Sequence, residues 1–89
     1  MALMKIEPTN ARVAWDARLE RQGRIVAGSR RLRVLGLTGR RDEIAAFRAD
    51  RGPRITYHLA TDGGDVALVF DARRRTWYIE AVDEVALAA

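Results

Sequence analysis

The sequence contains no cysteine, a single histidine and a single lysine among its 89 residues. The missing cysteines exclude disulfide bonds, thiolate metal sites and cysteine nucleophiles, so packing alone must stabilise the fold. The N-terminal residues hold no apolar run long enough for a signal peptide or a membrane span. These absences predict a small cytoplasmic domain with one modest core.

Positive charge comes almost entirely from arginine. Fifteen arginines and one lysine stand against twelve acidic residues, which gives a net charge of +4. Seven arginines and no acid lie between Arg21 and Arg41, whereas residues 55–89 carry three arginines and six acids. The chain is therefore basic in its first half and acidic in its last third. A GC-rich genome also produces an arginine bias, so this bias alone does not indicate a function.

The stretch from Arg54 to Val82 predicts three antiparallel strands joined by two tight turns. The first turn pairs Ala60 with Asp65, and the second pairs Asp71 with Thr76. A slip of one residue in either hairpin would destroy the match between apolar positions. This register places nine apolar side chains on one face of the sheet: Ile55, Tyr57, Leu59, Val66, Leu68, Phe70, Trp77, Ile79 and Ala81.

The chain before this sheet predicts a further hairpin. Residues 1–10 are expected to be a short lead-in, followed by one domain over residues 11–89. Apolar and polar residues alternate after Ala11, which predicts a strand with Trp15 in the core. Gln22-Gly23 is typical of a hairpin turn.

The return strand of this hairpin is expected to run from Arg24 to about Leu35, with a bulge at Gly28-Ser29. A short helix is expected from Arg40 to Asp50, because acids occupy its first turn and Gly52-Pro53 ends it. The tail from Asp83 to Ala89 predicts a last helical turn, with a short strand as the alternative.

Together these elements predict an α+β fold in the order ββαβββ. A twisted antiparallel sheet, able to curl toward a barrel, would hold the central helix on its apolar face.

No catalytic motif is present, and the sequence predicts a protein without enzymatic activity, cofactor or metal site. Ser29, the only serine, has no evident partner for nucleophilic catalysis. In the predicted register His58, Ala67 and Glu80 form one row across three strands, so His58 and Glu80 could share a small ligand. The alternative is a half-exposed strand histidine without a role.

The arginine-rich stretch carries the main functional hypothesis. Gly36 to Arg41 predicts a glycine turn leading into a helix, which can aim backbone N–H groups and arginines at an anion. The expected basic surface could contact several phosphates, although a merely solvated surface is the alternative. Its candidate residues are Arg21, Arg24, Arg30, Arg31, Arg33, Arg40 and Arg41.

A second group of candidate contacts lies at the tip of the last predicted hairpin. Arg73, Arg74 and Arg75 would meet an acidic partner there, with Tyr78 nearby; equally, they would prevent edge-to-edge pairing of strands.

The sequence thus predicts a small basic module that binds a nucleic-acid backbone or another polyanion through residues 21–41. The alternative is a protein-interaction or assembly module, such as a phage-type structural subunit or an inhibitor of a host protein. In that alternative the basic half meets an acidic protein surface, and a homo-oligomer is compatible with it. No membrane partner is expected.

Overall fold

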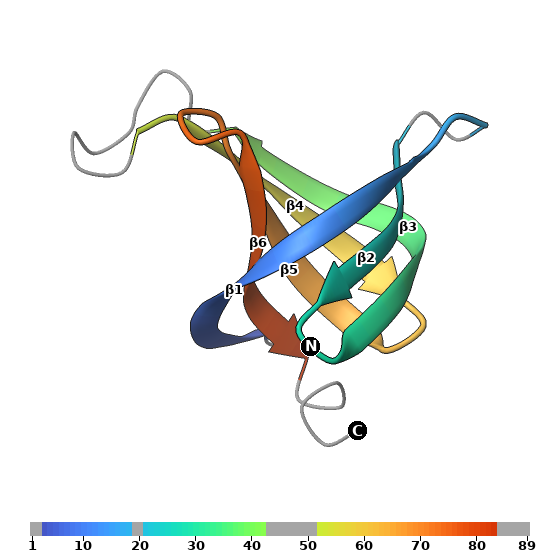
Figure 1. Ribbon diagram of the computed structural model, residues 1–89. Coiled ribbons are helices and arrows are strands. Elements are labelled where there is room, and N and C mark those ends of the chain that lie inside the picture. The colour runs from blue at the N-terminus through green and yellow to red at the C-terminus, as the bar shows by residue number, and fades with distance from the viewer. Residues whose placement is uncertain (1–2, 19–20, 43–51, 84–89) are drawn as a thin grey trace.

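Antiparallel strands close into a barrel in the computed structural model, which describes residues 3–18, 21–42 and 52–83 (Figure 1). The strands follow one another around the barrel in chain order, and the last pairs with the first. None of the described segments forms a helix long and apolar enough to cross a membrane. The six strands are β1 (Leu3–Asp16), β2 (Arg21–Ala27), β3 (Arg30–Asp42), β4 (Arg54–Thr61), β5 (Gly64–Asp71) and β6 (Thr76–Asp83).

The predicted α+β class is wrong, because no residue within the described ranges is helical and the fold is an all-β barrel. Arg40–Asp42, expected to begin the central helix, instead continue β3, with Arg40 opposite Tyr57. Pairing with β4 gives this backbone a partner strand, so propensity for a short helix is overridden. The rest of the expected helix, residues 43–50, and the expected tail turn, residues 84–89, lie outside the described residues.

The two longest strands, β1 and β3, pair with their two neighbours along different parts of their length. The first part of β1 pairs with β6 and its last part with β2, and Ala11 lies opposite both Trp77 and Ala27. β3 pairs with β2 up to Arg33 and with β4 from Val34 onward. Residues 3–10, expected as a lead-in, are therefore part of a strand that seals the barrel.

Irregularities in the ladders allow these long strands to bend. In β3 the register shifts between Val34 and Gly36 and again between Leu37 and Gly39. In β1 the ladder with β6 is interrupted around Pro8. Proline has no backbone N–H, so this interruption lets it lie in β1 without the loss of a ladder hydrogen bond. Such bulges increase local twist, which a closed barrel needs.

The first hairpin differs from its prediction, and Trp15 changes sides as a result. Gln22-Gly23 is not a turn but part of β2, with Gln22 opposite Trp15. The register shifts between Ala14 and Trp15, and Gly23 has no direct partner. This bulge breaks the strict alternation, so Trp15 is 63% exposed rather than in the core.

The expected bulge at Gly28-Ser29 is instead the turn between β2 and β3. Ala27 lies opposite Arg30, and Gly28 has a φ of 60°, a conformation that glycine adopts without strain. The single return strand predicted for residues 24–35 is therefore two strands.

The predicted sheet of the last three strands is largely confirmed. Between β4 and β5, Ala60 lies opposite Asp65 as expected. Between β5 and β6, Asp71 lies opposite Thr76, but a shift after Ala67 brings Val82 opposite Val66 in place of Ala81. The buried core joins this sheet to β2 and β3, and comprises Ile25, Ala27, Leu32, Val34, Leu59, Val66, Leu68, Ile79 and Val82.

Truncation of a core side chain should destabilise the barrel far more than truncation of Trp15. Leu68 is 0% exposed, so Leu68→Ala should lower the free energy of unfolding by about 2–5 kcal/mol. Trp15→Ala should change it by less than about 0.5 kcal/mol. Urea denaturation followed by circular dichroism checks both values. A large loss in the Trp15 variant would contradict the exposed position of this side chain.

Candidate functional site

The outer surface of β1, β2 and β3 carries arginines in neighbouring rows. Ile25 and Leu32 point into the core, so the residues that alternate with them point outward. In one row Arg24 on β2 lies directly opposite Arg33 on β3. We call this surface the arginine face, and define it by Arg12, Arg24, Val26, Arg31 and Arg33.

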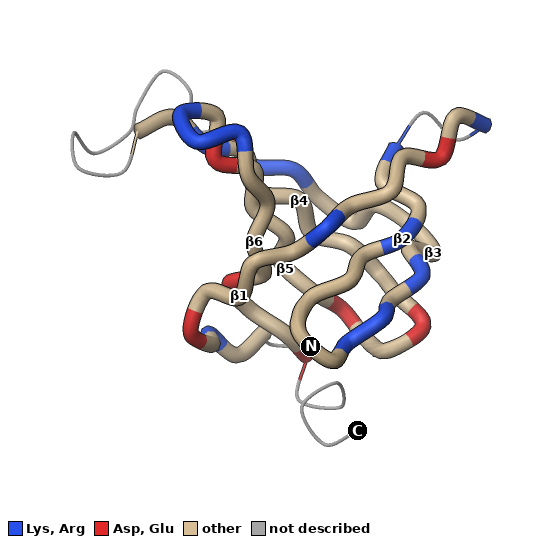
Figure 2. The backbone as a smooth tube through the Cα atoms, viewed as in Figure 1, with Lys and Arg blue, Asp and Glu red and all other residues tan. Residues whose placement is uncertain are grey.

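The second row joins all three strands. Arg12 on β1 lies opposite Val26, and Val26 lies opposite Arg31 on β3. Figure 2 shows blue segments side by side on β1, β2 and β3. Adjacent strands are about 4.8 Å apart and alternate residues along a strand about 7 Å, so one partner can touch several of these side chains.

Ion pairs within the described part of the chain do not neutralise the arginine face. The structure records no ion pair from Arg24, Arg31 or Arg33, nor from Arg12, to any residue it describes. Asp62, which lines a groove with Arg24 and Arg33, uses Oδ1 to accept a hydrogen bond from the Arg33 backbone N–H at 2.9 Å. Like charges directly opposite each other on paired strands are unfavourable. The opposed positions of Arg24 and Arg33 are therefore unfavourable for folding, and a bound anion would relieve the repulsion between them.

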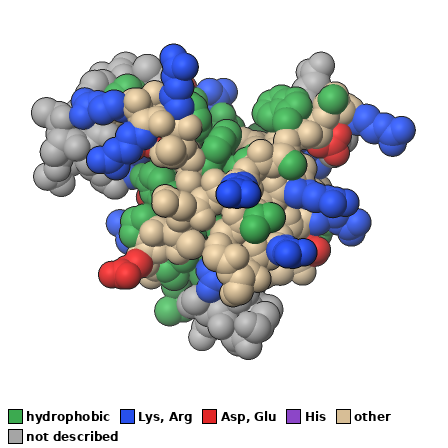
Figure 3. Space-filling view, in the orientation of Figure 1, with side chains coloured by type: hydrophobic (Ala, Val, Ile, Leu, Met, Phe, Trp, Pro, Cys, Tyr) green, Lys and Arg blue, Asp and Glu red, His purple; other side chains and the backbone are tan. Residues whose placement is uncertain are grey.

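Apolar side chains lie among these arginines. Val26 is 41% exposed, Leu35 is 55% exposed and Trp15 is 63% exposed. Figure 3 shows green apolar side chains beside blue ones over the part of the molecule formed by β1–β3. These side chains leave apolar surface in contact with water between the charged groups, which a bound molecule could cover.

Two grooves lie on either side of the Arg24–Arg33 pair, and both arginines line both of them. One groove, of about 440 Å³, also contains Val26, Arg31 and Asp62. The other, of about 630 Å³, also contains Trp15, Arg18 and Asp16. The paired arginines thus line two grooves, each of which also holds an apolar side chain, a further arginine and an aspartate.

The remaining arginines of the predicted surface lie elsewhere or are engaged. Arg21 donates from Nη2 to the Leu35 carbonyl at 3.3 Å. Arg30 is half-buried beside the β2–β3 turn. Arg40 lies 5.8 Å from the Tyr57 ring centroid and 3.5 Å from Asp42.

Arg41 is exposed opposite Thr56 on β4, in the part of β3 that has left β2. Because residues 36–42 form a strand, they offer no helix N-terminus to an anion. The single basic surface expected over residues 21–41 is therefore divided between two parts of the barrel.

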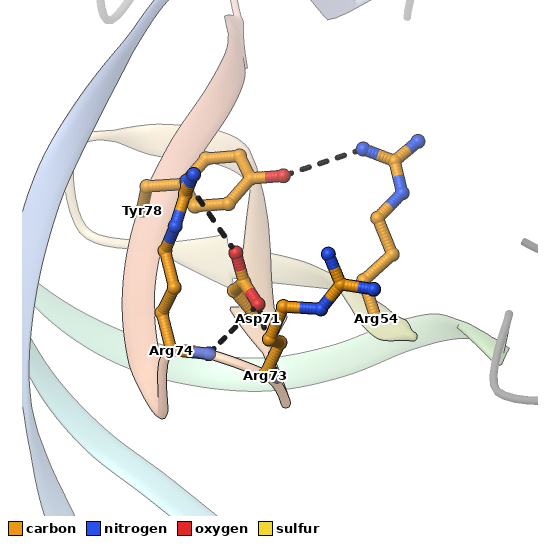
Figure 4. A network of polar contacts seen from close by, with 5 residues as sticks. All are labelled: Arg54, Asp71, Arg73, Arg74 and Tyr78. Carbon is orange, nitrogen blue, oxygen red and sulfur yellow. Dashed lines mark hydrogen bonds and ion pairs between the residues drawn. The ribbon is translucent and has the colours of Figure 1, made fainter. Parts of the chain in front are cut away.

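The arginines of the last hairpin form a separate group, of which Figure 4 shows Arg73 and Arg74. Asp71 Oδ1 accepts hydrogen bonds from the backbone N–H groups of Arg73 and Arg74, at 3.0 and 3.1 Å. Arg75 has a φ of 54°, so it closes the turn in the left-handed region. The Tyr78 hydroxyl accepts a hydrogen bond from Arg54 at 3.3 Å. Tyr78 is thus engaged on the barrel wall.

His58 and Glu80 do not share the expected row. The shift between Ala67 and Leu68 places Ala67 opposite Ala81, so Glu80 has no direct partner on β5. Glu80 instead forms an ion pair with Arg54 at 3.4 Å. In the part of the chain that the structure describes, no three His, Asp or Glu side chains form a group that could hold a metal ion.

Sequence reasoning missed Arg12 on the arginine face and Trp15 in the groove beside it. Arg12 joins the arginine face only through the pairing of β1 with β2, which the expected turn at Gln22-Gly23 concealed. Trp15 was expected in the core on the basis of alternation. A glycine within a strand pattern often marks a bulge, so Gly23 was the signal that could have revealed both.

Comparison with known proteins found no matching family model, no similar curated protein and no similar solved structure. The arrangement of side chains on the barrel therefore carries the functional argument.

Reversal of one central charge should stabilise the isolated protein. Arg24→Glu replaces a like-charged pair with an opposite-charged one, which should raise the free energy of unfolding by about 0.5–1 kcal/mol at low salt. Urea denaturation at low and high salt measures this gain, which should shrink as salt screens the pair.

Two further variants test whether repulsion between Arg24 and Arg33 is the cause of this gain in stability. Lys5→Glu makes the same change in net charge on an exposed residue opposite Ala81, and should give no comparable gain. Arg24→Glu/Arg33→Glu restores a like-charged pair and should lose the gain. A loss of stability in Arg24→Glu would contradict the repulsion.

Proposed function

We propose that the protein is a small non-enzymatic protein-interaction module that binds an anionic protein surface through the arginine face. The observation that supports this most directly is the position of Val26 in the row between Arg12 and Arg31. Protein interfaces combine a desolvated apolar centre with arginine and aromatic residues, and are depleted in lysine. The energetically dominant residues of such interfaces are most often Trp, Tyr and Arg.

A protein partner explains the apolar side chains better than a nucleic-acid backbone does. Phosphates offer charge to the arginines but little apolar surface to cover Val26 and Leu35, which are 41% and 55% exposed. Asp62 and Asp16 also line the grooves beside the arginines, so each groove offers a phosphate backbone one unfavourable contact among its arginines.

Nucleic-acid binding is the second candidate, and one observation favours it. Trp15 is exposed in the same groove as Arg24 and Arg33. A base can stack on such a ring while arginines contact neighbouring phosphates. Arg31 and Arg12 would then add backbone contacts.

A photo-reactive benzoylphenylalanine at position 26 tests the proposed function. Irradiation in an extract of the source cells should give a discrete protein cross-link, which mass spectrometry identifies. The cross-link should disappear in Arg24→Ala/Arg33→Ala and persist in Lys5→Glu, which changes the net charge equally. Light scattering then distinguishes a second copy of the chain from another protein.

Titration with single- and double-stranded DNA and RNA, at two salt concentrations, decides between the candidates. The proposed function requires no oligonucleotide binding beyond weak, non-specific attraction. Micromolar or tighter binding that falls steeply with salt and is lost in Arg24→Ala/Arg33→Ala would support the second candidate and overturn the first. Absence of any protein cross-link at position 26 would also overturn the first.

A further inference from the structure

We infer that the partner presents one carboxylate flanked by apolar side chains, and that Arg24 and Arg33 hold this carboxylate between them. The inference rests on the proposed function and names the chemistry of the partner segment. It follows from the central arginine pair, from the apolar side chains beside it and from the aspartates beyond them.

The central pair fits a single small anion. Arg24 and Arg33 lie directly opposite each other on β2 and β3, and both line both grooves. Cβ atoms of residues in such opposed positions are about 4.5–5.5 Å apart, so two guanidinium groups can converge on one carboxylate. Each planar guanidinium can donate two parallel hydrogen bonds to it. The bound anion would also relieve the repulsion between the two arginines.

The flanks of this position favour apolar side chains. Val26 lines the groove on one side and Trp15 lines the groove on the other. Their exposed fractions, 41% and 63%, leave apolar surface that a partner can remove from water. The grooves, with volumes of about 440 and 630 Å³, are large enough to receive side chains.

The aspartates oppose a second acid on the partner. Asp62 lines the groove that contains Val26, and Asp16 lines the one that contains Trp15. Asp62 is held in place, because its backbone N–H donates to the Arg33 carbonyl at 3.0 Å and its Oδ1 accepts from the Arg33 N–H at 2.9 Å. A second acid on the partner would meet one of these like charges in either groove, together with Arg31 or Arg18, whereas an acid between Arg24 and Arg33 meets only positive charge. A single acid avoids this repulsion.

Selection from a random peptide display library tests the inference. The library is selected against the wild-type protein, and binders that also bind Arg24→Ala/Arg33→Ala are discarded. The enriched peptides should share one Asp or Glu with apolar residues on both sides. Replacement of that acid by its amide in a synthetic peptide should weaken binding about tenfold to a hundredfold, as measured by fluorescence polarisation.

Three protein variants and one control distinguish a role in binding from a purely structural role. Arg24→Lys/Arg33→Lys keeps the charge but loses bidentate donation, so its affinity should be intermediate between wild type and the alanine variant. Trp15→Ala should weaken binding of the selected peptide, whereas Lys5→Glu should leave its affinity unchanged. Asp62→Asn should raise affinity for a peptide that carries a second acid, because it removes the repulsion and retains an acceptor for the Arg33 N–H.

The outcomes separate this inference from the proposed function. The inference of a single bound carboxylate would be overturned if the enriched peptides lacked an acid or carried runs of acids. It would also be overturned if they bound the alanine variant with unchanged affinity. A selection that enriches nothing would overturn it too. The cross-link at position 26 is measured independently, so the proposed protein-interaction function can survive any of these results.

Discussion

Closure of the ladder between β1 and β6 is the constraint on which the rest of the structure depends. Each strand of an antiparallel sheet needs two neighbours if no backbone donors and acceptors are to remain open at an edge. In this chain β1 and β3 join the other strands into a closed barrel, because each pairs with one neighbour along one part and with another along the rest. The bends that permit this sharing determine which side chains face outward.

The bulge opposite Gly23 shows how closure and surface are connected. A Cβ on Gly23 would lie 2.9 Å from the Asp16 Cβ, so only glycine allows β1 and β2 to approach in this way. The same bulge turns Trp15 out of the core and into the groove beside Arg24. A backbone irregularity needed by the barrel has thereby placed a large aromatic side chain beside Arg24, which forms no ion pair with any described residue.

The parts of the fold that could be predicted from sequence are those in which local turns determine the register. Thr61 to Gly64 reverses the chain within a few residues, and the pairing of Ala60 with Asp65 follows from that loop. Pairings that depend on closure had no such local signal. Arg40–Asp42 carry the composition of a helix start, yet pairing with β4 makes them a strand. Arg24, Arg31 and Arg33 lie close together in the sequence and could be assigned to one surface from it. The positions of Arg12 and Trp15 on this side of the barrel depend on the pairing of β1 with β2.

The arginine face also differs in its energetics from a surface that is only solvated. Long charged side chains on exposed strands commonly lie near opposite charges, as Arg54 does with Glu80 on the far wall of the barrel. Arg24 and Arg33 instead oppose each other, and neither forms an ion pair with a residue that the structure describes. The strand pairing fixes the backbone positions of both arginines before any partner arrives, so little backbone freedom remains to be lost on binding. A repulsion that the fold tolerates when free, and that a carboxylate relieves when bound, strengthens binding by raising the free energy of the unbound state. The arrangement therefore favours a partner that brings the missing negative charge to this one position, with apolar groups beside it.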